Sequence, residues 1–387
     1  NENFDFEGNL LKVKRQLVSD YRATVIDWPV APPPSAFEGQ IYTQNTEYDA
    51  LDRMIRQENW HIDGREPAVY IPQYNERGLL ISETLSVHGQ VTEAITDIRY
   101  DSKGQRIHIE YGNNTATRYK YDPETFRLIS LISTHTINNT LLQDLRYSYD
   151  PVGNITAIRD GSQQTVFFDN STVEPSSKFE YDALYRLTRA QGREHAQQNN
   201  FPQPGTLTGA PNVSFPTDHA LRNYEQNYSY DPVGNIDEMR HLALDGNWTR
   251  HYEYAGNSNR LLRTWQGNNT ADAVVYGYDT HGSMLNHNRV PDEFRLRWDN
   301  NDMIHHFNLG GGGGAWYNYG ADRERSRKRI ERIGGAVEER FYLGGMEVFR
   351  KLDASGQLQE EIETFHLFDG EQRVLVVEDV LHSNNPV

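Results

Sequence analysis

The chain has 387 residues, a formal net charge of −17 and no cysteine. This balance argues against binding to nucleic acid or anionic lipid, which needs clustered Lys and Arg, and it excludes disulfides and thiolate metal sites. No apolar run is long enough to span a membrane, and the N-terminus shows no signal-peptide pattern. Hydrophobic residues make up 36% of the chain, against roughly 45–50% apolar residues in compact domains. With 23 tyrosines and many turn residues, this favours a thin β-sheet.

The first predicted element is ambiguous. Residues 9–24 (NLLKVKRQLVSDYRAT) are the best helix candidate of the chain, although they are entered in a strand-like manner. Two stretches rich in Pro, Asn or Gly, near 28–40 and near 195–220, predict loops that interrupt a longer array. Residues 1–387 are therefore interpreted as one repetitive β segment.

The array is a repeat that begins with an aromatic residue, usually followed by Asp. The stretch YSYDPVGNI occurs at 147–155 and again at 228–236. Most steps between units are 20–28 residues. The units begin at Phe4, Tyr48, Tyr74, Tyr100, Tyr121, Tyr149, Tyr181, Tyr230, Tyr254, Tyr278, Trp298, Tyr319 and Tyr342. A structural unit is built many times in one chain, whereas an active site is normally built once.

Each unit predicts a strand, a tight turn and a returning strand. Asp150, Pro151 and Gly153 stand where a type I turn favours them, and the flanking residues alternate with the period of a strand. Stacked hairpins bury one another's faces, and we expect the recurring Tyr to stack on its neighbour in the next unit. The expected turn residues are Tyr149, Asp150, Pro151, Gly153, Tyr181, Asp182, Tyr230, Asp231, Pro232, Gly234, Tyr278, Asp279 and Gly282.

Readings as a catalytic or metal site are weaker. Asp150 and Asp231 are the obvious carboxylate pair, but turn chemistry explains both. His305 and His306 are adjacent, so on a strand they point to opposite faces, and His281 and His287 lack a third ligand. There is no G-x-S-x-G nucleophile elbow. No catalytic residue, metal site or cofactor is therefore predicted.

Three further features have structural explanations. The glycines at 310–314 are not followed by GK[ST], so they predict a flexible connection between strands rather than a phosphate loop. The basic run 322–332 predicts a solvated strand face in preference to a site for an acidic partner. The aromatic residues, among them Trp60, Trp248, Trp265 and Trp316, suit repeat packing, although stacking on sugars or contacts with a non-native polypeptide stay open.

Several stretches resemble the tyrosine–aspartate repeats of Rhs proteins and of the C subunits of insecticidal toxin complexes. They are YDALYRLTRAQGRE, YSYDPVGNI, WYNYGADRERSRKRI and ERFYLGGMEVFRKL. The segments GNLLKVKRQLVSDYRATVIDW and ETFHLFDGEQRVLVVED also resemble that region of the family. The resemblance implies an all-β fold in which repeat hairpins form a spiralling sheet, part of a hollow shell around a cytotoxic C-terminal polypeptide. It also implies a secreted or cell-surface toxin particle and, as partners, further shell chains or the B-type subunit.

The chain departs from the family at one point. In the family a core with two DPxGL-type motifs follows the repeats and cleaves the chain through aspartates; neither that core nor a toxin domain is visible here. The two DPVGN copies are followed by Ile and lie in ordinary repeats, so this catalytic role is not transferred to Asp150 or Asp231. The expected function is a shell segment that shields a toxic polypeptide. The alternatives are a cell-surface carbohydrate-binding or adhesion module and, less favoured, a carbohydrate-active enzyme.

Overall fold

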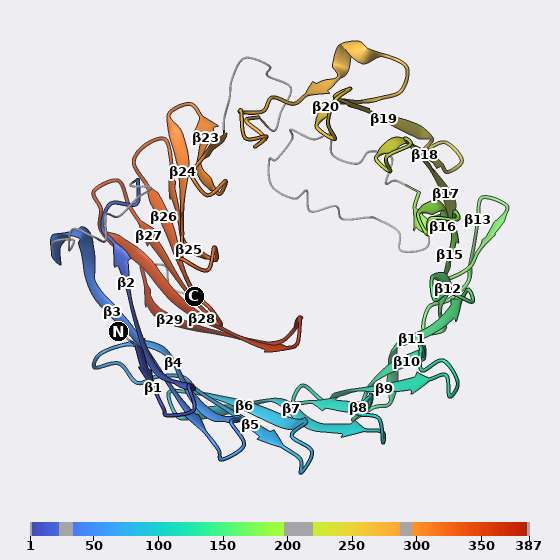
Figure 1. The fold of residues 1–387 in the computed structure, drawn as a ribbon. Helices are drawn as coiled ribbons and strands as arrows, with labels where there is room; N and C mark the ends of the chain where they lie inside the picture. Colours follow the sequence, from blue (N-terminus) through green and yellow to red (C-terminus); the bar gives the residue numbers. More distant parts are fainter. Residues whose placement is uncertain (1, 23–33, 197–219, 287–295, 385–387) are drawn as a thin grey trace. The chain divides into compact units, whose positions relative to one another are not determined.

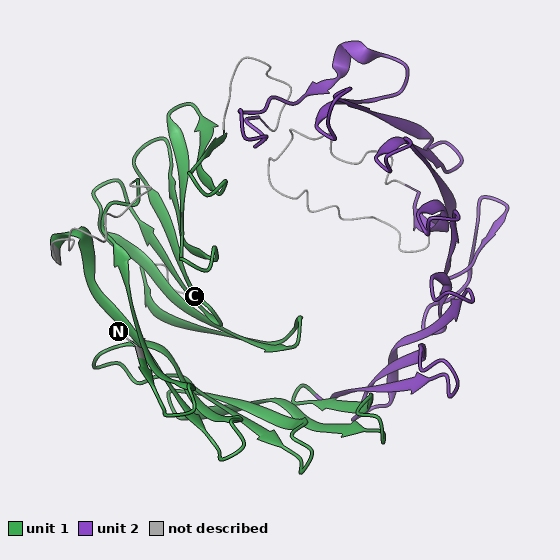
Figure 2. Ribbon diagram, viewed as in Figure 1, with its two compact units in different colours: residues 1–113, 295–387 green, residues 114–294 purple. Residues whose placement is uncertain are grey.

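The computed structural model describes residues 2–22, 34–196, 220–286 and 296–384. In these ranges the regular structure consists of β-strands and two short 3₁₀ turns, η1 (Pro34–Ala36) and η2 (Thr270–Asp272) (Figure 1). The all-β prediction is thereby confirmed. The chain divides into two compact units, residues 1–113 with 295–387 and residues 114–294 (Figure 2).

Unit 1 contains two antiparallel meanders, in which each strand pairs with the next along the chain. The first is β1 (Glu2–Phe4), β2 (Leu10–Val18), β3 (Phe37–Tyr48), β4 (Met54–Ile62), β5 (Val69–Tyr74), β6 (Leu80–Val87), β7 (Gln90–Tyr100) and β8 (Arg106–Tyr111). The second is β22 (Leu296–Trp298), β23 (Ile304–Gly310), β24 (Gly313–Tyr319), β25 (Arg325–Glu331), β26 (Val337–Leu343), β27 (Met346–Leu352), β28 (Leu358–Asp369) and β29 (Gln372–Ser383).

The hydrophobic core of unit 1 lies where its two meanders pack face to face. It joins side chains of β2 to β7 with side chains of β26 to β28. Tyr42, Trp60 and Leu85 contribute from the first meander, and Phe341 and Met346 from the second, each at most 4% exposed. Burial of this apolar face is the main stabilising term for such a two-layer arrangement.

Unit 2 is a single meander with one inserted hairpin. Its main strands are β9 (Thr115–Tyr121), β10 (Leu128–His135), β11 (Thr140–Tyr149), β12 (Ile155–Asp160), β15 (Ser176–Tyr181), β16 (Leu187–His195), β17 (Leu221–Tyr230), β18 (Ile236–Leu242), β19 (Trp248–Tyr254), β20 (Leu261–Gln266) and β21 (Val274–Val275). Each pairs antiparallel with its neighbour, and β12 pairs directly with β15. The insertion is the hairpin of β13 (Val166–Phe168) and β14 (Ser171–Val173).

Unit 2 has little buried apolar volume of its own. Among its described residues, the buried hydrophobic side chains are small: Ala116, Val173, Ala190, Ala243 and Val274. Most other strand residues are half-buried on one face and half-buried or exposed on the other. The low hydrophobic fraction of the chain is explained by this thin sheet, since only unit 1 builds a two-layer core.

Three sequence expectations need correction here. The helix candidate 9–24 is wrong where the structure describes it, because its residues form β2 and pair with β1 and β3. The glycine run does connect two strands, β23 and β24, but only Gly311 and Gly312 form the turn, at positive φ, while Gly313 and Gly314 are buried strand residues. Of the loop predicted near 28–40, residues 37–40 already belong to β3; residues 28–33 lie outside the described ranges, as does most of the loop predicted near 195–220.

Candidate functional site

The first YSYDPVGNI copy forms the turn between β11 and β12. The backbone N–H of Gly153 donates to the carbonyl of Asp150 (3.2 Å), and the N–H of Asp150 donates to the carbonyl of Asn154 (3.0 Å). One carboxylate oxygen of Asp150 accepts from the N–H groups of Gly153 (2.7 Å) and Asn154 (2.9 Å). Gly153 has a φ of 113°, a conformation that side chains rarely adopt. Asp150 therefore caps the turn, and Gly153 supplies its left-handed residue.

The other expected turns have the same geometry. The carboxylates of Asp182, Asp231 and Asp279 each accept from backbone N–H groups two and four residues later, at 2.8–3.0 Å. Pro151 and Pro232 occupy exposed second positions, and Gly234 and Gly282 have φ of 98° and 100°. In the Asp182 turn a tyrosine, Tyr185, stands in the left-handed position at a φ of 63°.

The electrostatics of these carboxylates suit turns better than acid–base catalysis. Partial desolvation opposes ionisation of Asp150, but hydrogen bonds from Asn154 and Gly153 outweigh it and lower the pKa of Asp150; the pKa of Asp231 is lowered in the same way. The two turns stand two hairpins apart, about 19 Å at the usual spacing of strands. The structure therefore does not bring Asp150 and Asp231 together.

The repeat tyrosine ties each hairpin to the one before it. The hydroxyl of Tyr149 donates to the carbonyl of Leu128 (2.6 Å), the first residue of the return strand in the preceding unit. The same bond recurs at 2.6–3.0 Å along the chain. Its donors are Tyr100, Tyr149, Tyr181, Tyr230, Tyr254, Tyr278 and Tyr319, and its acceptors are the carbonyls of Leu80, Leu128, Ile155, Leu187, Ile236, Leu261 and Ile304. We call this series the tyrosine ladder.

An arginine completes the link between neighbouring turns. The guanidinium of Arg127 lies 5.7 Å from the ring centre of Tyr149, and Arg186 lies 4.6 Å from that of Tyr230. Arg127 also donates to the carbonyl of Asp150 (2.9 Å) in the next turn. The expected stacking of repeat tyrosines is thus replaced here by a hydroxyl bond and an arginine over the ring. An Arg four or five residues after the turn Asp is visible in the sequence and could have predicted this contact.

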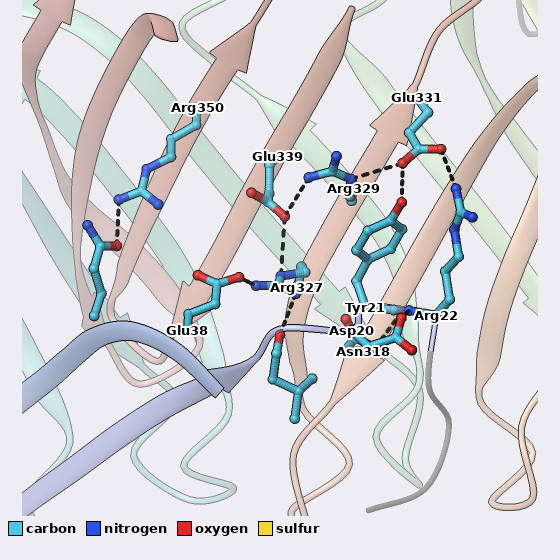
Figure 3. A network of polar contacts seen from close by, with 12 residues as sticks. Asp20, Tyr21, Arg22, Glu38, Asn318, Arg327, Arg329, Glu331, Glu339 and Arg350 are labelled. Atoms are coloured by element: carbon cyan, nitrogen blue, oxygen red, sulfur yellow. Dashed lines mark hydrogen bonds and ion pairs between the residues drawn. The ribbon is translucent and has the colours of Figure 1, made fainter. Parts of the chain in front are cut away.

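A second polar cluster joins the two meanders of unit 1, and we call it the seam (Figure 3). Arg327 on β25 is 1% exposed and donates to the carbonyl of Val18 (2.8 Å). Its guanidinium also pairs with Glu38 on β3 and, at 3.3 Å, with Glu339 on β26. Burial lowers the pKa of Arg327, while Glu339 opposes that shift. A buried cation is tolerated in this way only where carboxylates and carbonyls surround it.

The seam continues at the end of β25. Glu331 accepts from the hydroxyl of Tyr21 and from Arg22 (3.0 Å). Arg329 lies 4.4 Å from the ring centre of Tyr21, and the Tyr21 ring meets Trp316 edge-on at 5.7 Å. The segment after β2 is therefore fixed to the second meander by ion pairs and aromatic contacts together (Figure 3).

Further ion pairs cross between the meanders around β28. Arg65 of the first meander reaches Glu361 (3.1 Å) and Glu363 (2.9 Å). Arg350 pairs with Glu361 (2.8 Å) inside the second meander and donates to Gln40 (2.8 Å) of the first. Arg106 on β8 pairs with Asp369 at the end of β28. The two meanders are thus joined by charges at several places around the apolar core.

One carboxyl near the Arg106–Asp369 pair is buried beside a phenol. Glu83 is 1% exposed and accepts from the hydroxyl of Tyr70 (2.8 Å), while among the described residues its other oxygen has no hydrogen-bond donor. Burial raises the pKa of Glu83, and burial with the nearby Glu83 charge raises the pKa of Tyr70. This pair holds its proton more tightly than either group does in water.

The structure corrects the expectation for the basic run 322–332. A solvated strand face, with alternate side chains facing water, was predicted, yet Arg327 is buried in the seam and Arg329 is largely covered. The partners Glu38 and Val18 of Arg327 lie 289 and 309 residues away in sequence, so no local pattern points to them. In the sequence only a basic run is visible, and such a run is equally expected on a strand that faces water.

The remaining candidate ligands are dispersed. The His306 ring lies 4.8 Å from that of Trp316 at a tilt of 46°, and burial lowers the pKa of His306. Trp60 is 4% exposed in the core. His287 lies outside the described residues. Over the described ranges, no three His, Asp or Glu side chains gather closely enough to hold a metal ion. No helix among the described residues is long and apolar enough to cross a membrane.

Comparison with known proteins places this geometry among toxin subunits. Toxin subunit YenC2 of Yersinia entomophaga is 32% identical over 286 residues, which cover 70% of this chain and 28% of that protein. Toxin subunit YenC1 of the same organism is 36% identical over 196 residues, which cover 49% of this chain and 20% of that protein. The chain thus spans less than a third of the length of these curated relatives. No protein-family model matches the chain.

Solved structures give the same result for the fold. The crystal structure of TcdB2–TccC3–TEV superposes with a TM-score of 0.79 at 25% identity, covering 100% of this chain and 18% of that chain. TcdB2–TccC3 gives 0.78 at 26% identity, covering 99% and 18%. A Photorhabdus luminescens Tc holotoxin pore also gives 0.78, at 25% identity with the same coverage. These relatives do not favour the adhesion module, and they are consistent with a non-enzymatic role.

The tyrosine ladder predicts a measurable loss from a single hydroxyl. Tyr149→Phe removes the bond to Leu128 and keeps the ring, so we expect a loss of about 0.5–1.5 kcal/mol in the free energy of unfolding. Tyr185→Phe, at a tyrosine that is 60% exposed, should stay within about 0.5 kcal/mol of the parent. Urea unfolding of both variants tests this, and equal losses would contradict a specific role for the ladder.

The seam predicts a larger loss. Arg327→Met removes the buried cation that Glu38 and Glu339 share, and Glu339 keeps only Arg329 (3.4 Å), so we expect unfolding to become easier by about 3 kcal/mol. Adding Glu339→Leu should restore part of that stability. The control is Arg332→Met, because Arg332 is 54% exposed and pairs with Glu338 at the surface, where about 0–1 kcal/mol is expected. Thermal unfolding of the variants measures these differences. Equal losses of stability from Arg327→Met and Arg332→Met would refute the structural role of the seam.

The buried Glu83 predicts a pH dependence with a definite sign. The native pKa of Glu83 is raised, so its contribution to stability is present at low pH and is lost as pH rises from about 4.3 through the native pKa. The glutamine of Glu83→Gln does not titrate, so the stability of the variant relative to the parent should rise as pH increases. We expect the difference in melting temperature to move in favour of the variant between pH 4 and pH 8. A constant difference across that range would show that Glu83 does not titrate with folding.

Proposed function

Because the chain is a TcC-like Rhs protein, we propose that it forms part of the wall of a Tc toxin shell, which encloses a cytotoxic polypeptide until delivery. The observation that carries the proposal is the antiparallel pairing of each described strand with the next along every meander, two in unit 1 and one in unit 2. Neighbouring strands stand 4.7–4.9 Å apart, so a fully paired sheet leaves no opening through which a polypeptide can pass. The mechanism is steric: cargo behind such a wall meets neither protease nor target.

The tyrosine ladder and the seam supply the stiffness that a wall needs. The described strands of unit 2 form no second layer, so each hairpin depends on its two neighbours. Unit 1 is reinforced by the core and the buried Arg327 cluster. We therefore assign the repeat turns, Asp150 and Asp231 included, a structural role. The aspartyl self-cleavage implied by the family resemblance belongs to a core motif that these turns do not match.

The proposal includes partners and a compartment. The solved relatives are complexes of TcdB2 with TccC3, so we propose that this chain assembles with a B-type subunit and with further shell polypeptide. The enclosed toxic polypeptide is part of the proposal as well. The particle is proposed to be secreted, in line with its toxin-subunit relatives.

The deciding experiment is electron microscopy and intact-mass measurement of the native particle that contains this chain. We expect a closed hollow particle whose mass includes polypeptide beyond the wall, and that polypeptide should resist protease until the particle is opened. An open β-array, at the mass of this chain alone, would overturn the proposal. In that case the adhesion module would be the function to test next, by glycan binding.

A further inference from the structure

One face of the unit 2 sheet carries an aromatic residue in every second strand. The residue two places before each repeat aromatic is Tyr119, Tyr147, Phe179, Tyr228, Tyr252 or Tyr276. Direct cross-strand pairing connects these positions. Leu131 opposes both Tyr119 and Leu145, Tyr147 opposes Ile158, and Tyr228 opposes Met239. Directly paired residues share a face, so the six rings form a single row, which we call the aromatic row.

The opposite face of the same strands has a different chemistry. It carries most of the strand charges, for example Arg146, Lys178, Arg189 and Glu225, several of them in ion pairs. Arg189 pairs with Glu225 at 2.5 Å, and its hydrogen bonds lower the pKa of Glu225 to about 2. Charge depletion with tyrosine enrichment on one face is the composition of the centre of a binding interface.

Unit 1 shows what becomes of the equivalent positions when a layer covers them. There the residues two places before Tyr48, Tyr74 and Tyr100 are Thr46, Pro72 and Ile98, all buried. Their sheet face packs on the second meander through the hydrophobic core. The unit 2 row is instead half-buried and aromatic, and Tyr228 keeps its hydroxyl bonded to Gln226 (2.7 Å). Such amphipathic rings suit contacts that form and break in water, not a permanently dry core.

The spacing of the row indicates the kind of partner. Rings on every second strand recur about every 10 Å, close to the length of three residues of an extended chain. A surface that repeats the same aromatic contact about every 10 Å suits an extended polymer better than a partner of one particular fold. We propose that the aromatic row binds extended, non-native polypeptide through its apolar side chains. The row thus deepens the proposed shell function, on which its biological role rests, by naming the surface that meets the cargo.

The binding test uses the full chain and reduced, carboxymethylated α-lactalbumin, a permanently unfolded polypeptide. Replacing Tyr147, Tyr228 and Tyr252 together by Thr, which favours strands, should weaken binding by about tenfold or more, the equivalent of roughly 1.4 kcal/mol. Replacing the same three by Phe should retain it. The control is Phe6→Ser with Phe167→Ser, which removes two rings that are 96% and 73% exposed outside the row. Fluorescence anisotropy gives the affinities, and equal weakening by the control and the Thr variant would overturn the proposal.

A second measurement does not depend on the Thr variant folding. The photo-crosslinker p-benzoylphenylalanine replaces Tyr147 on the row or Arg146 on the charged face, one residue away. We expect crosslinks to the unfolded polypeptide from position 147 and few from position 146; the reverse, or equal yields, would refute the row. Failure of the shell would appear separately, as a native particle without enclosed mass. An intact, loaded particle that crosslinks only from position 146 would support the shell function and refute cargo binding by the aromatic row.

Discussion

The structure depends on one bond that recurs: the tyrosine hydroxyl of one hairpin to the first return-strand carbonyl of the hairpin before it. Backbone pairing alone fixes neighbouring strands, but a thin sheet that is wet on both faces specifies its register poorly. The ladder adds one side-chain hydrogen bond of defined length between each repeat hairpin that carries it and the hairpin before. The arginine over the tyrosine ring places the turns in line as well. The contacts of Tyr and Arg at the turns therefore fix the register between neighbouring strands of unit 2, because the described part of that unit has almost no hydrophobic core to do so.

Unit 1 solves the same problem by other means. Its two meanders pack on an apolar core, and charged groups surround that core at the seam. Arg327 is buried and takes its partners Glu38 and the Val18 carbonyl from the other meander, so a shift of the two layers would leave its charge short of partners in a low-dielectric site. The two units therefore show two ways of stabilising the same repeat, with the tyrosine ladder running through both.

Much of this was predictable from sequence because the repeat is local. Asp150 and Gly153 define a turn within four residues, and alternation around Tyr149 defines the strands. The all-β fold and the resemblance to toxin C subunits followed from such local evidence. Residues 10–18 were harder, since their spacing suits a helix and only pairing with β1 and β3 makes them a strand. The seam could not be predicted, because Glu38 and Val18 reach Arg327 from the other meander through tertiary structure alone.

The discontinuity of unit 1 has a consequence for synthesis. Its first meander is complete at residue 113, but the meander that covers its apolar face begins only at residue 295. The ribosome must add 294 − 113 = 181 residues in between, which takes about 10–40 s at 5–20 residues per second. During that interval Tyr42, Trp60 and Leu85 have no covering layer from the second meander. The nascent chain therefore exposes the apolar face of its first meander for many seconds. We expect a chaperone at the exit tunnel to bind that face during synthesis.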